Sequence, residues 1–185
     1  MARQGFSSSD VVDFPPASFT AVANTVTETN LWTVGLWSTI PAFDLRAGKM
    51  YVVRAGGILS TTVTPTVVWT ARYGTSATST SNISIGASTA VATGSGLVNV
   101  PWHAEFVLGC RQVGVAAAGA TVTGNGFAVL GNVAAAAAQV ATFGSTIPTT
   151  VDQTIQGGIC ITLTWGTASA SNTATCQWAN LQSLN

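Results

Sequence analysis

The chain has 185 residues and little charge: six Lys and Arg, six Asp and Glu, one His, and a formal net charge of zero. Charged residues make up 6% of the sequence, against roughly 25% in ordinary soluble proteins. A surface this poor in charge favours association, so we expect partner proteins to cover much of it. The basic residues, spread from Arg3 to Arg111, form no patch in the sequence, which argues against nucleic acid as a partner.

No stretch of the sequence is predicted to span a membrane. The longest apolar run, residues 133–138, is far below the roughly 18 residues that a spanning helix needs. The N-terminus also lacks the apolar region of a secretory signal. We therefore expect no membrane partner, and we expect synthesis in a cytosol.

Three cysteines, Cys110, Cys160 and Cys176, are widely spaced and contain no CxxC pair. We interpret them as buried apolar thiols, as is usual in cytosolic proteins. A Cys160–Cys176 bridge between neighbouring strands is the alternative. The spacing of potential ligands predicts neither a metal site nor a cofactor site.

Residues 1–17 differ in character from the rest of the chain. Residues 1–10 are polar, and the following Asp-Phe-Pro-Pro segment is expected to be extended, because proline disfavours helix in the residue before it. We interpret 1–17 as an extended N-terminal arm ahead of a domain spanning 18–185; a disordered tail is the alternative. The residues predicted to contact another subunit are Val11, Val12, Phe14, Pro15 and Pro16.

From residue 18 onward, strand-length runs alternate with turn signals. Strands are predicted over residues 19–29, 31–40, 50–59, 65–73 and 83–85, with a bulge at Gly56-Gly57. The run 65–73 alternates most regularly, with one face formed by Val67, Trp69, Ala71 and Tyr73.

The second half continues in the same way, with strands predicted over 101–115, 121–130, 155–165 and 173–181. Along 101–115 one face carries Trp102, Ala104, Phe106, Leu108 and Cys110, and the other carries His103, Glu105 and Val107. Residues 132–139 are rich in alanine and are the one predicted helical piece. Eight or more strands of this length predict an all-β, antiparallel two-sheet sandwich or barrel.

Catalytic motifs are scarce. His103 is the only histidine, and Glu105 shares its strand face, so the two could form an acid–base pair. We prefer the other interpretation, a histidine on a surface or at an interface. No nucleophile elbow, phosphate loop or zinc spacing occurs. We expect no catalytic residues and no enzymatic activity; a lytic or esterase-like enzyme would depend on His103.

Six tryptophans fall in or beside predicted strands: Trp32, Trp37, Trp69, Trp102, Trp165 and Trp178. A carbohydrate-binding protein would expose two or three of them on one face to stack against sugar rings. A structural protein would bury them in its core or between subunits, where tryptophan supplies a large apolar area. We prefer the structural interpretation, in which the tryptophans are buried in the core or between subunits.

The chain resembles the small jelly-roll structural proteins of tailed bacteriophages, described as minor capsid, decoration or tail proteins. The resemblance covers most of the chain from about residue 20. It depends on the segments TVTET (25–29), LRAGK (45–49), VRAGGIL (53–59), PTVVWTARYG (65–74), WHAEF (102–106), ITLTWG (161–166) and ASASNT (168–173).

This resemblance implies a jelly-roll β-sandwich and a virion protein, assembled in the host cytoplasm. Its most specific implication is a capsid decoration, or cement, protein that forms a homotrimer on the outer capsid surface and bridges subunits of the major capsid protein. The N-terminal arm would then reach onto the capsid. The alternative is a tail-tip or fibre module that binds a host surface glycan.

Overall fold

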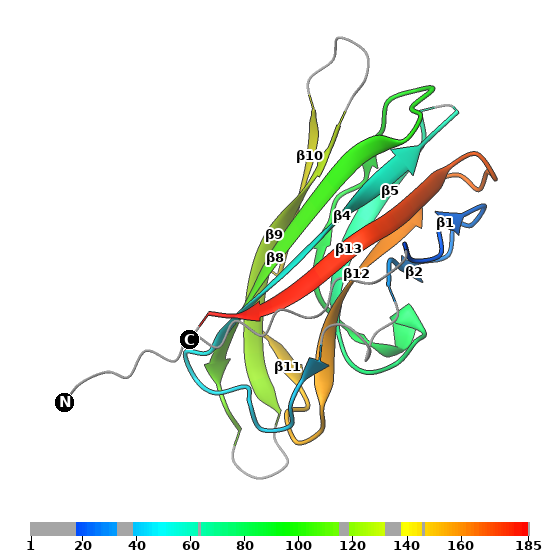
Figure 1. Cartoon of the computed structure of the whole chain (residues 1–185). Coiled ribbons are helices and arrows are strands. Elements are labelled where there is room, and N and C mark those ends of the chain that lie inside the picture. Colours follow the sequence, from blue (N-terminus) through cyan, green and yellow to red (C-terminus); the bar gives the residue numbers. More distant parts are fainter. Residues whose placement is uncertain are drawn as a thin grey trace.

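Figure 1 shows a computed structural model of the chain, which describes residues 18–32, 39–62, 64–114, 119–131, 138–145 and 147–184. Within these residues every element is a strand except the short 3-10 helix η1 (Ser79–Ser81). The expectation of an all-β protein is confirmed. The predicted arm, with its contact residues Val11, Val12, Phe14, Pro15 and Pro16, lies outside the described residues.

The strands form a nearly closed antiparallel sheet. In chain order they are β1 (Val22–Ala23), β2 (Thr29–Asn30), β3 (Thr39–Ile40), β4 (Met50–Ser60), β5 (Thr66–Tyr73), β6 (Ile83–Ser88), β7 (Val91–Ala92), β8 (Val100–Gln112), β9 (Ala120–Leu130), β10 (Gln139–Gly144), β11 (Thr149–Val151), β12 (Gly157–Trp165) and β13 (Thr173–Ser183). Their order in the sheet is β1-β13-β4-β8-β9-β10-β6-β5-β12-β2. Outside this path, β11 pairs with β9, β3 with β12 and β7 with β5.

The two ends of this order, β1 and β2, follow each other directly in the chain. Residues 19–31, here called the seam strap, therefore run from β13 to β12 across the gap in the sheet (Figure 1). At one end the Phe19 N–H donates to the Cys176 carbonyl at 2.9 Å. At the other end the Leu31 N–H donates to the Ile161 carbonyl at 3.0 Å. These bonds satisfy backbone groups that an open edge would leave to water.

The strand predicted over 19–29 is wrong in extent, because only β1 and the first residue of β2 are strand within it. Of the strand predicted over 31–40, residues 31–32 are not strand, residues 39–40 form β3, and residues 33–38 lie outside the described residues. Asn24 has a φ of 51°, a left-handed conformation that ends β1 after two paired residues. Its N–H then bonds to the Ser169 carbonyl at 3.1 Å.

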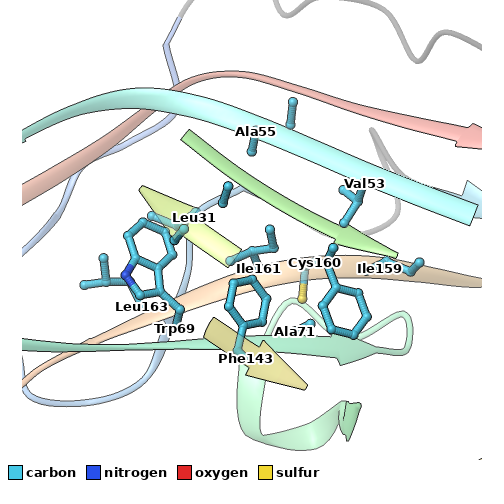
Figure 2. Packing of buried hydrophobic residues seen from close by; sticks show 14 of the residues in the cluster. Leu31, Val53, Ala55, Trp69, Ala71, Phe143, Ile159, Cys160, Ile161 and Leu163 are labelled. Carbon is cyan, nitrogen blue, oxygen red and sulfur yellow. The ribbon is translucent and has the colours of Figure 1, made fainter. Parts of the chain in front are cut away.

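The core lies inside the curled sheet, between the β4–β8 side and the β5–β12 side (Figure 2). The faces predicted from alternation in β5 and β8 are confirmed, because their apolar members are all buried. Trp69 and Trp102 meet there with ring centroids 5.2 Å apart. In β12 burial does not alternate along the strand. Cys160 and Thr162 are as buried as Ile161, because the seam strap covers the outer side of β12.

The bulge predicted at Gly56-Gly57 lies on the neighbouring strand instead. Pairing of β4 with β8 is continuous through both glycines, whereas pairing with β13 shifts between Cys176 and Trp178. A Cβ on Gly57 would lie 1.9 Å from the Thr175 carbonyl oxygen, so glycine permits this close approach of β13. The extra residue reverses the alternation, and Cys176 faces the core while Trp178 faces outward.

Residues 132–137 lie outside the described residues, and Gln139, included in the predicted helical piece, begins strand β10. The described part of the chain contains no helix with the length and hydropathy of a membrane span.

Candidate functional site

The outward face of β13, β4 and β8 carries the residues that sequence analysis considered for chemistry. His103 and Glu105 both point outward from β8, as predicted, and both are partly exposed. They do not pair with each other. The Glu105 carboxylate accepts a hydrogen bond from Arg54 Nε at 2.5 Å, while His103 lies beside the Trp178 ring with centroids 5.5 Å apart. The acid–base pair that these positions allowed is therefore not formed, and His103 lies at the surface, in agreement with the preferred interpretation.

Arg54 connects three strands through its guanidinium group. It lies in β4 directly opposite Glu105 of β8 and Asn180 of β13. Besides its bond to Glu105, its Nη1 donates to Oε1 of Gln182 at 3.1 Å. The Arg54 and Glu105 side chains are 35% and 26% exposed, so the pair stays in contact with solvent.

Trp178 occupies the next outward row of the sheet, in which Gly56 pairs with both Trp178 and His103. A Cβ on Gly56 would lie 2.6 Å from Trp178 Nε1 and 2.7 Å from two ring carbons. One side of the indole therefore lies against the glycine backbone. Trp178 is only partly buried, so its exposed area belongs to the side that faces away from the sheet.

Side chains of these two rows, together with Gln182 from the next row beyond Arg54, form what we call the outer-face cluster: Arg54, His103, Glu105, Trp178 and Gln182. The cluster combines an aromatic surface with fixed hydrogen-bond donors and acceptors, and its Arg–Glu pair has no net charge. Beside it, Oδ1 of Asn180 is buried and receives no hydrogen bond. Such an arrangement can hold a polar, uncharged group through hydrogen bonds.

Toward β9 and β10 the same face becomes apolar. Phe127 is 38% exposed and lies opposite Glu105 on the neighbouring strand, and Val140 on β10 is 54% exposed. A shallow hollow beside them is lined by Asn125, Gly126, Phe127, Thr142, Phe143, Gly144 and Ser145.

A second Arg–Glu pair lies under the seam strap. The Glu28 carboxylate accepts two bonds from Arg72, from Nε at 2.5 Å and from Nη2 at 2.7 Å. Thr162 donates to the same carboxylate at 2.5 Å. Burial by itself would raise the pKa of Glu28, but the bonds from Arg72 and Thr162 and the charge of Arg72 outweigh it, so the pKa is lowered. This pair fixes the strap to β5 and β12.

The three cysteines are buried and free, as expected, and the alternative Cys160–Cys176 bridge does not occur. Burial raises the pKa of Cys160 and that of Cys176 to about 12, so both thiols remain protonated at neutral pH. Within the described residues no group of three or more His, Cys, Asp or Glu side chains could hold a metal ion.

The tryptophans divide between core and surface. Trp32, Trp69, Trp102 and Trp165 are buried, as the structural interpretation predicted, and Trp37 lies outside the described residues. Trp178 is the exception among those described. Sequence reasoning missed this exception because plain alternation places Trp178 on the same face as Cys176; the bulge between them has no signal in the sequence.

Comparisons with known proteins add little to this geometry. No protein-family model matches the chain, and no curated protein matches it. Among solved structures it is similar to the CBM2 module of the evolved Dit of Lactobacillus casei BL23 phage J-1, with 10% identity, a TM-score of 0.30, and coverage of 90% of this chain and 74% of that one. A TM-score of 0.30 transfers neither fold nor function.

Proposed function

We propose that the chain is a structural protein of a tailed-bacteriophage virion: a jelly-roll decoration protein that trimerises on the outer capsid surface and bridges major capsid subunits. The resemblance in sequence supports the virion assignment. The jelly-roll assignment, with two facing sheets, belongs to the same proposal and is supported by the curled antiparallel sheet. In this role the chain has no catalytic activity and needs no cofactor.

The observation that carries the proposal is the scarcity of free charge on the surface. Of the nine charged residues in the described part of the chain, six form three ion pairs: Lys49–Asp44, Arg54–Glu105 and Arg72–Glu28. Only three described charged side chains, Arg46, Arg111 and Asp152, remain outside ion pairs. A surface with so few free charges gives little repulsion between copies and favours burial against protein.

Exposed apolar side chains support the same conclusion. Val98 and Ile147 are each 72% exposed, and Phe43 is 63% exposed. On the outward face of the sheet Phe127 and Val140 add apolar area beside the outer-face cluster. Contact with neighbouring subunits would remove these groups from water, at a gain of about 25 cal/mol per Å² of apolar surface.

A decoration protein stabilises the capsid by coupling its own binding to capsid assembly. A protein that binds the assembled shell but not its separated subunits stabilises the shell by mass action. The predicted arm, residues 1–17, would extend this contact, because a segment that becomes ordered on binding covers a large surface for its length. This part of the proposal concerns Val11, Val12, Phe14, Pro15 and Pro16.

The first test is the copy number in purified particles of the phage that encodes the chain. Decoration predicts an intense stained band near 18.8 kDa, comparable to that of the major capsid protein. A faint band would contradict decoration. For the arm, deletion of residues 2–14 should lower capsid occupancy, and unchanged occupancy would exclude the arm as a capsid contact.

A second candidate function, a tail-tip or fibre module that binds a host surface glycan, is supported by one observation: the outward position of Trp178 among polar side chains. It shares the fold and the oligomer with the first candidate. A tail module predicts few copies per particle and binding of the free protein to host cells.

A further inference from the structure

The Trp178 side chain has the geometry of a stacking platform. One side of the indole is supported by Gly56, whose lack of a Cβ lets the ring lie close to the backbone of β4. Trp178 points outward from β13 and is partly exposed as a residue, so the side of the ring away from Gly56 is the one that a ligand could reach. We propose that the outer-face cluster binds an uncharged sugar ring, which stacks on Trp178 and is hydrogen-bonded by the neighbouring polar side chains. This inference names the site and the ligand class of the glycan-binding candidate above and rests on that candidate, while it goes beyond the decoration role.

Stacking accounts for the aromatic half of the site. The face of an indole ring carries partial negative charge, and the C–H groups on one side of a sugar ring carry partial positive charge. The same contact removes apolar area of both partners from water. His103 flanks the indole at 5.5 Å with a 38° tilt, which limits the ring's freedom to turn away.

The polar half of the site is fixed in advance by its own hydrogen bonds. Arg54 uses Nε for Glu105 and Nη1 for Gln182, which leaves three of its five N–H donors for a ligand. Glu105 keeps Oε1 as an acceptor, and the Gln182 amide keeps its NH₂ group as a donor. Sugar hydroxyls both donate and accept hydrogen bonds, so they match this mixed set of donors and acceptors. Small-molecule sites commonly combine a few placed polar groups with an apolar wall.

The spacing of the two halves fits one sugar residue. Arg54 and Gly56 are two residues apart on β4, so the rows of Arg54 and Trp178 are separated by about 6.8 Å along the strand. A ring stacked on Trp178 therefore brings its peripheral hydroxyls to Arg54 and Glu105. The ligand is uncharged because Arg54 and Glu105 already neutralise each other, and an acidic sugar would face the Glu105 carboxylate.

The direct test uses the purified full chain and the methyl glycosides of glucose, galactose, mannose, rhamnose, N-acetylglucosamine and N-acetylgalactosamine, with N-acetylneuraminic acid as the acidic comparison. Saturation-transfer NMR detects weak binding, and titration gives the Kd. We expect at least one neutral sugar to bind with a Kd of about 1 mM or tighter, and the acidic sugar to bind more weakly. Absence of binding by every neutral sugar at about 10 mM would overturn the proposal.

Variants locate the binding site. Trp178→Ala should weaken binding about tenfold or more, whereas Phe43→Ala, which removes an exposed aromatic ring outside the cluster, should leave it unchanged. Gly56→Ala keeps the indole but forces it to move, since the added Cβ would lie 2.6 Å from Nε1, and it should also weaken binding. Urea unfolding of each variant checks that it is folded.

Two outcomes would assign the cluster another role. If sugars bind the wild-type chain and Trp178→Ala alike, the site lies elsewhere and the proposal is overturned. If no sugar binds and Trp178→Ala lowers the association state in sedimentation, the cluster is a contact between subunits. Particle copy number is measured separately, so failure here leaves the decoration proposal standing.

Discussion

The described part of the chain contains two Arg–Glu pairs with the same closest N–O distance, 2.5 Å, in different surroundings. In the pair under the seam strap, Arg72 and Glu28 are 15% and 17% exposed and are joined by two hydrogen bonds. In the outer-face pair, Arg54 and Glu105 are 35% and 26% exposed and share one bond. The more buried pair holds the seam strap against the sheet, whereas the outer-face pair remains open to a ligand or partner.

The largest expected effect comes from removing the charge under the strap. Arg72→Met leaves the Glu28 carboxylate partly buried without its cation, and removal of one partner from such a pair costs about 3 kcal/mol of unfolding free energy. Urea unfolding followed by tryptophan fluorescence measures this difference. A loss below about 1 kcal/mol would be typical of a surface ion pair, and this pair would then not differ from the outer-face pair.

Cysteine labelling tests whether that loss is local to the strap. Cys160 Sγ lies 3.4 Å from Asn30 Oδ1 of the strap, whereas Cys176 faces the core from β13. Arg72→Met should speed alkylation of Cys160 about tenfold or more under native conditions, because local opening exposes it. The rate at Cys176 should rise less, as read by mass spectrometry of the labelled peptides. Equal acceleration at both sites would indicate global rather than local opening.

Acid should weaken the strap pair selectively. The folded pKa of Glu28 is below its ordinary value of 4.5. A carboxyl with a lowered folded pKa stabilises the protein above its unfolded pKa, and this contribution is lost as the pH falls through the folded pKa. Melting temperatures of wild type should therefore fall below about pH 4.5 more steeply than those of Glu28→Gln. Parallel curves for the two proteins would contradict the pKa shift.

The smallest effect is expected for the matched change on the outer face. Arg54→Met removes a half-exposed partner, so the loss in unfolding free energy should be about 0–1 kcal/mol. Cys160 labelling should stay at the wild-type rate. A loss as large as that of Arg72→Met would show that the outer-face pair also holds the fold together. The same variant should weaken sugar binding, which separates a binding role from a structural one.

Sequence reasoning predicted the long strands well, because alternation in β5 and β8 directly reflects burial on one face. It predicted the seam strap poorly, since two-residue strands leave no periodic signal and the strap is defined by partners far away in the chain. Only part of the outer-face cluster could be predicted from the sequence. His103 and Glu105 share a strand, but Arg54 and Trp178 join them only through sheet register, and a bulge in β13 decides which way Trp178 points.

The central claim is that other protein subunits cover this charge-poor surface. Sedimentation velocity of the purified chain over a range of concentrations tests it most directly, with mass determined by light scattering. We expect assembly beyond the 18.8 kDa monomer, as a trimer, at micromolar concentration. A chain that stays monomeric and soluble at high concentration would contradict the claim.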